Sequence, residues 1–149
     1  MSERWFPDSM PPPMVDHHTL PWWRGAAEHR LLVQQCAQCQ HCQLPPAPVC
    51  SACTSFATTL QEIPGSGTLY SYTVVHRAVA MEQQLPFIIA IIELAMDSLP
   101  HSNGVRMMSN IVDADPAELR IGQAVQVAWE TLSDEVSVPR FRLADRRMR

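Results

Sequence analysis

Two Cys-x-x-Cys pairs constrain this chain more than any other feature of its sequence. Cys36 and Cys39 form the first pair, Cys50 and Cys53 form the second, and ten residues separate the pairs. Two such turns brought together present four thiolates at the corners of a tetrahedron, which is the geometry of a closed structural zinc site. A double pair at this spacing predicts a zinc ribbon holding one structural Zn²⁺, whereas a single pair is weak evidence.

A closed shell of four sulfurs leaves no coordination position for water, so we expect no chemistry at the metal. Two alternatives stay open: a vestigial ribbon whose thiols act as small apolar side chains, and a redox pair. The remaining cysteine, Cys42, follows Cys39 by three residues. We interpret it as a free thiol, because a metal shell that used it would lose the ten-residue spacing.

Length and composition predict a small intracellular protein. The 149 residues suffice for one ordinary domain or two very small ones. No apolar run is long enough to span a bilayer, and the polar, Pro-rich start does not resemble a signal peptide, so we expect a cytoplasmic location and no membrane contact. A reducing cytosol keeps thiols free, which again favours a metal site over disulfides. Charged residues make up only 17% of the chain, as in proteins that cover part of their surface with a partner.

The charge distribution argues against binding to nucleic acid. All 11 basic residues are arginine, and five of them lie in the last ten residues: Arg140, Arg142, Arg146, Arg147 and Arg149. The rest of the chain carries an excess of Asp and Glu. An acidic body is a poor match for a phosphate backbone, which requires a field of cations.

The chain divides into five segments. Consecutive prolines predict a flexible or partner-bound arm over residues 1–19. Short N-terminal helices are expected over residues 20–34, where a proline stands at the start. The zinc ribbon is expected over 35–55, a β domain over 56–143 and a basic tail over 144–149. The adjacent tryptophans of the helical segment, Trp22 and Trp23, either pack on the protein's own core or form a docking face for another subunit.

The β domain is predicted to be a small Greek-key barrel of the OB type. Residues rich in β-branched and aromatic types recur in short stretches separated by turn signals. One of these stretches, 86–95, is a continuous apolar run and is predicted to be a strand buried on both faces. Five or so short strands, with one helical turn before the penultimate strand, are typical of an OB-fold, so the fold class is mainly β. The expected strands cover residues 56–63, 68–77, 86–95, 105–112 and 124–130, and a last one includes Phe141 and Leu143.

These motifs resemble the family called domain of unknown function 35 (DUF35). The resemblance covers about residues 21–143 and begins with Pro21-Trp22-Trp23 and the two cysteine pairs that flank Pro45-Pro46. It continues with Gly65-x-Gly67-Thr68, the run from Tyr72 to Arg77, Pro86-Phe87, Glu93-Leu94, Asn110-Ile111-Val112 and Ile121-Gly122-x-x-Val125. The family usually has Gly after the second cysteine of each pair, where this chain has Gln40 and Thr54.

The resemblance implies a rubredoxin-like zinc ribbon joined to an OB-fold, and an association with acyl-CoA metabolism. It implies a non-catalytic accessory subunit that assembles with a thiolase, a C-acyltransferase, a hydroxymethylglutaryl-CoA synthase-like enzyme or a thiolase-like aldolase. Such a subunit helps to hold the acyl-CoA substrate, while the partner supplies the catalytic groups. The residues expected to contact the partner or the acyl-CoA are Trp22, Trp23, His76 and Arg77.

Two other functions stay open at this point. Zinc ribbons and OB-folds also occur in modules that bind single-stranded nucleic acid, although the acidic body makes this the less favoured reading. An independent enzyme acting on acyl-CoA is the other alternative. The sequence contains no nucleophile motif for such an enzyme. We therefore assign no catalytic residue and do not expect the chain to be catalytic alone.

Overall fold

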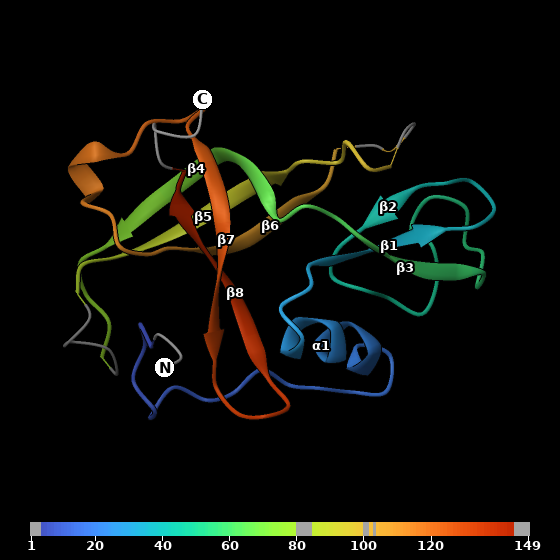
Figure 1. Ribbon diagram of the computed structural model, residues 1–149, viewed down its shortest axis with the longest axis horizontal. Coiled ribbons are helices and arrows are strands. Elements are labelled where there is room, and N and C mark those ends of the chain that lie inside the picture. Colours follow the sequence, from blue (N-terminus) through green and yellow to red (C-terminus); the bar gives the residue numbers. More distant parts are fainter. Residues whose placement is uncertain (1–3, 80–84, 100–101, 103, 145–149) are drawn as a thin grey trace.

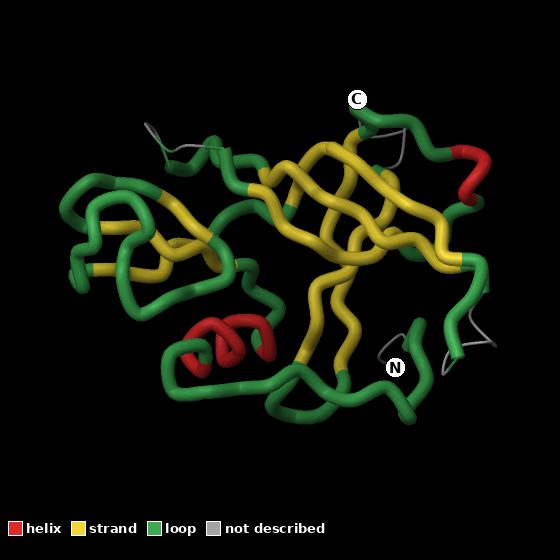
Figure 2. The backbone as a smooth tube through the Cα atoms, turned by 180° about the vertical axis from the view of Figure 1, so that it is seen from behind, coloured by secondary structure: helices red, strands yellow, loops and turns green. Residues whose placement is uncertain are grey.

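The computed structural model of the chain describes residues 4–79, 85–99, 102 and 104–144. The described residues form two modules that lie side by side, with one α-helix beneath them (Figures 1 and 2). Helix α1 (Leu20–Ala27) precedes a small sheet of β1 (Leu32–Cys36), β2 (Cys42–Gln43) and β3 (Thr58–Glu62). The second module contains β4 (Ser66–Val75), β5 (Phe87–Leu94), β6 (Arg106–Ile111), β7 (Ala124–Thr131) and β8 (Ser137–Leu143). No helix in this described part of the chain combines the length and the apolar character that crossing a bilayer requires.

The second module is a closed five-stranded barrel of the OB type. Its strands follow the order β4-β5-β6-β8-β7, and β7 pairs back with β4. All neighbours are antiparallel except β6 and β8, which meet in parallel register at Ile111 and Phe141. A 3₁₀ turn at Pro116–Glu118 precedes β7, the penultimate strand. This order is a Greek key, and it confirms the predicted mainly β fold.

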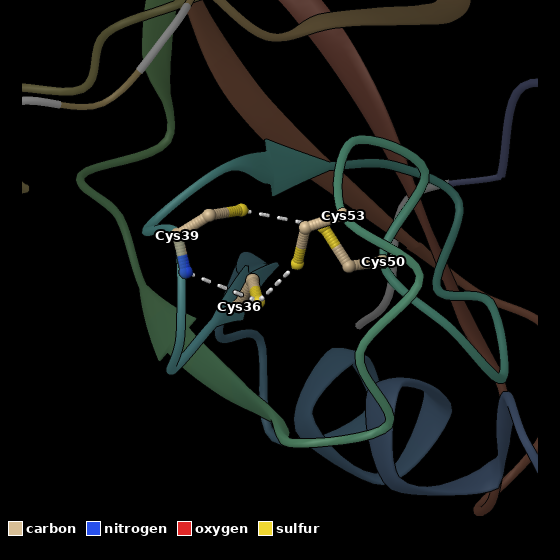
Figure 3. Close-up of side chains that lie close together, drawn as sticks. All are labelled: Cys36, Cys39, Cys50 and Cys53. Atoms are coloured by element: carbon tan, nitrogen blue, oxygen red, sulfur yellow. Dashed lines mark hydrogen bonds between the residues drawn. The ribbon is translucent and has the colours of Figure 1, made fainter.

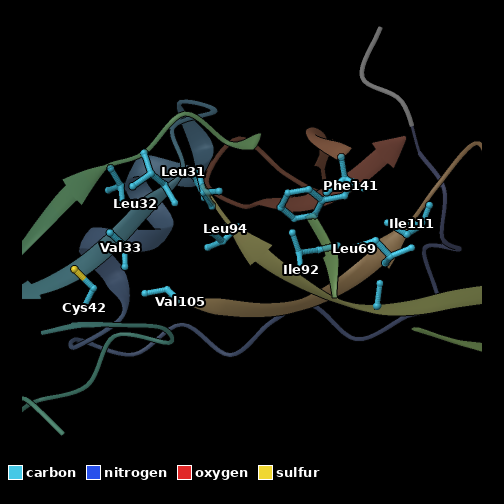
Figure 4. Close-up of a cluster of buried hydrophobic side chains, with 14 of the residues drawn as sticks. Leu31, Leu32, Val33, Cys42, Leu69, Ile92, Leu94, Val105, Ile111 and Phe141 are labelled. Carbon is cyan, nitrogen blue, oxygen red and sulfur yellow. The ribbon is translucent and has the colours of Figure 1, made fainter. Parts of the chain in front are cut away.

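One continuous apolar core joins the two modules. Figure 4 shows buried side chains running from Val33 and Cys42 in the small sheet to Ile92 and Phe141 in the barrel. Val33, Ile92 and Phe141 are fully excluded from solvent. Because the same core serves both sheets, the small sheet is fixed against the barrel rather than tethered to it.

The helical segment expected over residues 20–34 is shorter than predicted. Helix α1 ends at Ala27, and His29 takes a left-handed conformation (φ 59°) that cannot continue a helix. Leu32 and Val33, which follow, are buried in strand β1. A β-branched residue in a fully covered position packs well on a sheet, so the chain changes from helix to strand at this point.

The strand expected over residues 56–63 belongs to the small sheet rather than to the barrel. It runs from Thr58 to Glu62 and pairs antiparallel with β1, from Leu32 opposite Glu62 to Cys36 opposite Thr58. Gly65, with φ 78°, then turns the chain into β4, the first barrel strand. The ribbon sheet therefore extends beyond the predicted range 35–55.

The N-terminal arm, expected to be flexible or bound to a partner, lies against the barrel at its described start. Phe6 is only 7% exposed, and its ring meets the Phe87 ring edge to face at 5.9 Å between centroids. The backbone N–H groups of Trp5 and Phe6 each donate to Glu130 Oε1 at 3.0 Å. The Phe6 ring and the two backbone N–H groups hold the start of the arm against the barrel. Of the predicted basic tail over 144–149, only Ala144 falls within the described residues.

Strand β5, predicted to be buried on both faces, is fully buried on one face only. Ile88, Ala90 and Ile92 point into the barrel core, with at most 3% of each side chain exposed. Ile89 and Ile91 alternate with them, and are half-buried. Successive side chains of a strand point to opposite faces, so these two isoleucines lie on the outside of the barrel wall.

Candidate metal centre

The four paired cysteines converge on one point. All four Sγ atoms lie within 4.8 Å of one another, and the Cys36–Cys53 and Cys39–Cys50 Sγ pairs are each separated by 3.6 Å. Figure 3 shows the sulfurs turned toward a common centre between the two knuckles. A zinc ion with Zn–S bonds of about 2.3 Å places its sulfurs about 3.8 Å apart, so the arrangement fits tetrahedral Zn²⁺.

The two knuckles have equivalent backbones. In the first, Gln40 N donates to Cys36 O at 3.0 Å; in the second, Thr54 N donates to Cys50 O at 2.9 Å. Gln40 (φ 64°) and Thr54 (φ 62°) both take the left-handed conformation that suits glycine. The knuckles therefore form without the glycines usual in DUF35, at a cost of about 1 kcal/mol for each residue.

Backbone amides stabilise negative charge on the first cysteine. The N–H of Cys39 (3.5 Å) and that of Gln38 (3.4 Å) both donate to Cys36 Sγ, and they lower the pKa of Cys36 to about 6. In the second knuckle, Ala52 N donates to Cys50 Sγ at 3.4 Å. Ligands must be deprotonated to bind a metal, so the two amides at Cys36 favour the form of that sulfur that Zn²⁺ requires.

Cys42 lies outside the cluster of four sulfurs. It begins strand β2, its side chain is 1% exposed, and its Sγ donates to Gln40 O at 3.7 Å. Burial raises the pKa of the Cys42 thiol, which keeps it neutral. Because Cys42 lies outside the cluster, the metal shell keeps the ten-residue spacing between its two cysteine pairs. Cys42 is instead a core residue.

Two glutamine side chains, which the sequence reasoning missed, fix the linker between the knuckles. Gln34, in strand β1, accepts from Ala47 N at 2.9 Å and donates to Ala47 O at 2.8 Å. Gln43 donates to Gln34 Oε1 at 2.8 Å and accepts from Ser51 N at 2.8 Å. Gln34 and Gln35 are polar residues inside a mostly buried strand, and this was the available signal. The stiff Pro45–Pro46 linker is thereby attached to the sheet that carries the metal site.

The two tryptophans have different environments. Trp22 is 6% exposed, and its indole N–H donates to Leu32 O at 2.8 Å, so it is a core residue. Trp23 meets the Trp22 ring edge to face at 4.9 Å and is half-buried. Of the pair, Trp23 is the residue with more surface to offer a ligand or a partner.

A groove of about 440 Å³ lies between α1, the Pro45–Pro46 linker and strands β6 and β8. Its lining is mostly apolar and includes Trp23, Leu44, Met107 and Met108, and Arg106 and Arg140 are its charged residues. Clefts of this size and composition are typical of sites for small molecules. The groove shares the Pro45–Pro46 linker with the metal centre.

His76 and Arg77 lie apart from this groove. They follow the end of β4, both are exposed, and neither is among the residues that line the groove. The structure therefore does not bring them together with Trp22 and Trp23, and their contact with acyl-CoA stays a prediction. Arg106, by contrast, lies in the groove wall.

A buried ion pair lies beside the groove and was not foreseen. Glu130 is fully buried, and both Nε and Nη2 of Arg140 lie 2.8 Å from its Oε2. Arg140 also donates to Asn110 Oδ1 at 2.8 Å. Arg140 is among the five arginines of the last ten residues, but strand β8 carries its side chain into the protein.

Two family models match the chain in succession. Residues 23–59 match the model described as "ChsH2, rubredoxin-like zinc ribbon domain". Residues 60–130 match the model described as "ChsH2, C-terminal OB-fold domain". The boundary between the two models falls inside β3.

Individual proteins show the same similarity. A DUF35 domain-containing scaffold protein of Methanocaldococcus jannaschii is 32% identical over 117 residues, which are 76% of this chain and 77% of that protein. A probable enoyl-CoA hydratase alpha subunit of Thermomonospora curvata is 32% identical over 134 residues, which are 90% of this chain. The chain spans only 40% of the length of that relative.

A solved structure titled "Ltp2-ChsH2(DUF35) aldolase" matches the fold. The TM-score is 0.77 at 32% identity, and the match covers 89% of this chain and 99% of the matched chain. Ribbon and barrel therefore occur together in that protein in the arrangement described above.

Proposed function

The chain belongs to the DUF35 family in its ChsH2 form, a zinc ribbon followed by an OB-fold, and we propose on that basis that it is the non-catalytic scaffold subunit of a thiolase-superfamily enzyme. The observation that carries the proposal is the match, over nearly a whole chain, to a solved aldolase whose title names both Ltp2 and ChsH2(DUF35). In this proposal the partner supplies the nucleophile and the acid–base groups of the reaction.

The metal has a structural role in this proposal. Cys36, Cys39, Cys50 and Cys53 hold one Zn²⁺, which cross-links the two knuckles and adds folding energy to the ribbon. We place the protein in the cytoplasm, because thiolate ligands persist in a reducing compartment. The four sulfurs, already gathered within 4.8 Å of one another, support this role.

We further propose that the groove beside the ribbon helps to hold the acyl-CoA substrate. Its mostly apolar lining suits an acyl chain. Among the tryptophans, Trp23 is the one that offers surface to such a ligand. The name of the Thermomonospora curvata relative, a probable enoyl-CoA hydratase subunit, agrees with a CoA thioester as the ligand class.

The alternative, a module for single-stranded nucleic acid, has little support from the barrel surface. OB-folds bind such ligands on the face of their second and third strands, which are β5 and β6 here. That face carries Ile89, Ile91 and Met108, and its Arg106 is already paired with Glu93 at 3.1 Å. Binding to a phosphate backbone needs cations that are available to it.

Co-expression with thiolase-superfamily proteins of the same organism tests the proposal. We expect one of them to co-elute with this chain in size-exclusion chromatography and light scattering to give the mass of a hetero-oligomer. Elemental analysis should find one zinc for each copy of this chain. A chain that stays alone in solution at micromolar concentration of both proteins would refute the scaffold function.

A further inference from the structure

The outer surface of the barrel carries an apolar patch on three adjacent strands. Ile89 and Ile91 lie on the outside of β5, the middle strand, and Ile91 is paired with Met108 of β6. Met108 is 70% exposed, and Tyr70 at the bulge of β4 is 45% exposed. We call these four residues, Tyr70, Ile89, Ile91 and Met108, the outer patch.

A strand that is apolar on both faces requires cover on both faces. In an antiparallel barrel, one face of a strand packs on the core and the solvent face is normally polar. The core covers the inner face of β5, and Phe6 covers one end of its outer face, where it meets Phe87. Toward the other end of that face, Ile91 is half-buried and Met108 of the neighbouring strand is 70% exposed.

The charges beside the outer patch cancel one another. Arg106 and Glu93, which face each other across β5 and β6, form an ion pair at 3.1 Å. The Arg106 guanidinium also stacks over the Tyr70 ring at 3.7 Å. The area is thus neutral on a chain of net charge −4. Nucleic acids and anionic membranes both need excess cations, so neither fits this surface.

The composition of the outer patch is instead typical of a surface that binds another protein. The centres of protein interfaces are depleted in unpaired charge and enriched in aromatic residues, Met and Arg. Tyr70, Met108 and the neutralised Arg106 have this composition. A neutral surface also lets an acidic chain approach a partner without like-charge repulsion.

We propose that the outer patch is the surface on which the catalytic thiolase-superfamily subunit docks. The proposal rests on the scaffold function and adds the location of the surface that binds the catalytic subunit. Met108 and Arg106 belong both to this surface and to the wall of the groove. A subunit seated on the outer patch therefore borders the groove, and a ligand held there contacts both proteins.

Replacing Met108 by an acid tests the location. The variant Met108→Asp places a charge in the patch at a position that is exposed and so does not disturb the barrel core. Ile121→Asp is the matched control, because Ile121 is 69% exposed and stands in the turn before β7, outside the patch. Tyr70→Asp is a second patch variant on another strand. Zinc content and thermal melting establish that each purified variant is folded.

Dissociation constants for the thiolase-superfamily protein that co-purifies with this chain, measured by biolayer interferometry, give the readout. We expect Met108→Asp and Tyr70→Asp to weaken binding by about 30-fold or more, as loss of a hot-spot side chain does. Ile121→Asp should bind as wild type does. Wild-type affinity in both folded patch variants overturns the docking surface but leaves the scaffold function standing. Wild-type protein that binds no catalytic subunit overturns the scaffold function itself. A wild-type homodimer that Met108→Asp converts to monomer assigns the patch to a second copy and also overturns the proposal.

Discussion

The buried carboxylate of Glu130 should be among the most sensitive positions for stability. Its Oε1 accepts the backbone N–H groups of Trp5 and Phe6, and its Oε2 accepts two donors of Arg140. The variant Glu130→Ala removes these four interactions at once, together with the ion pair between Glu130 Oε1 and Arg4 Nε at 3.8 Å. It also leaves the guanidinium of Arg140, which is 8% exposed, without its counter-charge.

The expected loss in the free energy of unfolding depends on the polar groups that the substitution leaves without a partner. Removing one partner of a buried ion pair costs about 3–5 kcal/mol, because the other charge stays buried. Asn110 still accepts one donor of Arg140, which places the expected loss toward the lower end of that range. The two amides of the N-terminal segment add little, since a terminal segment can detach and regain water. A loss of about 3–4 kcal/mol corresponds to a fall in Tm of about 10 °C in a chain of this length.

Urea denaturation of the zinc-loaded protein, followed by tryptophan fluorescence and circular dichroism, measures the loss. Glu62→Ala is the control, because Glu62 forms an exposed ion pair with Arg30 at 2.9 Å, and such pairs contribute about 0–1 kcal/mol. Arg140→Ala and the double variant complete a cycle that isolates the coupling of the pair. If Glu130→Ala destabilises the protein no more than Glu62→Ala does, the buried network does not hold the arm and barrel together.

Three further substitutions address the metal centre. Cys36→Ser should lower the zinc content well below one ion per chain and melt the ribbon, which elemental analysis and circular dichroism check; unchanged zinc would exclude Cys36 as a ligand. Gln34→Ala should cost about 1–3 kcal/mol in urea denaturation, because Ala47 loses both of its hydrogen bonds to the Gln34 side chain, and a neutral effect would show that the linker is held otherwise. Thr54→Gly should be more stable than Thr54→Ala by about 1 kcal/mol in the same assay, since Thr54 has φ 62°; equal stabilities would contradict the cost assigned to that conformation.

Local patterns in the sequence predicted the features that depend on local chemistry. The spacing of the cysteines predicted the cluster of sulfurs, because each knuckle is made by consecutive residues. The alternation and turn signals after Gly65 predicted strands β4, β5, β6 and β7 within one or two residues, and for β8 only its C-terminal part. Gln40 and Thr54 stand where the resembling family usually has glycine, and both take the left-handed conformation that suits glycine.

Features that depend on pairing across the fold were not predictable in the same way. Strand β3 has the composition of a barrel strand, and only its five-residue register with β1 assigns it to the ribbon. Glu130 ends an alternating strand where a carboxylate normally faces water, and its partners come from both ends of the chain. The outward isoleucines of β5 made the run 86–95 look buried on both faces. These isoleucines belong to the outer patch, on which we propose that the catalytic subunit docks.

The metal and the groove should respond together when zinc is removed. The cysteine pairs fix the two ends of the segment 40–49, and Gln34 and Gln43 fix its middle, so the Pro45–Pro46 wall of the groove rests on both supports. Hydrogen exchange followed by mass spectrometry should therefore show the Ala47 amide protected in the zinc-loaded protein and exchanging faster after chelation. The amide of Ile92, in the middle of the barrel, serves as the control and should change much less, because its strand is paired on both sides. Equal protection of Ala47 with and without zinc would mean that the glutamines alone hold the linker, and the metal would then have no part in shaping the groove.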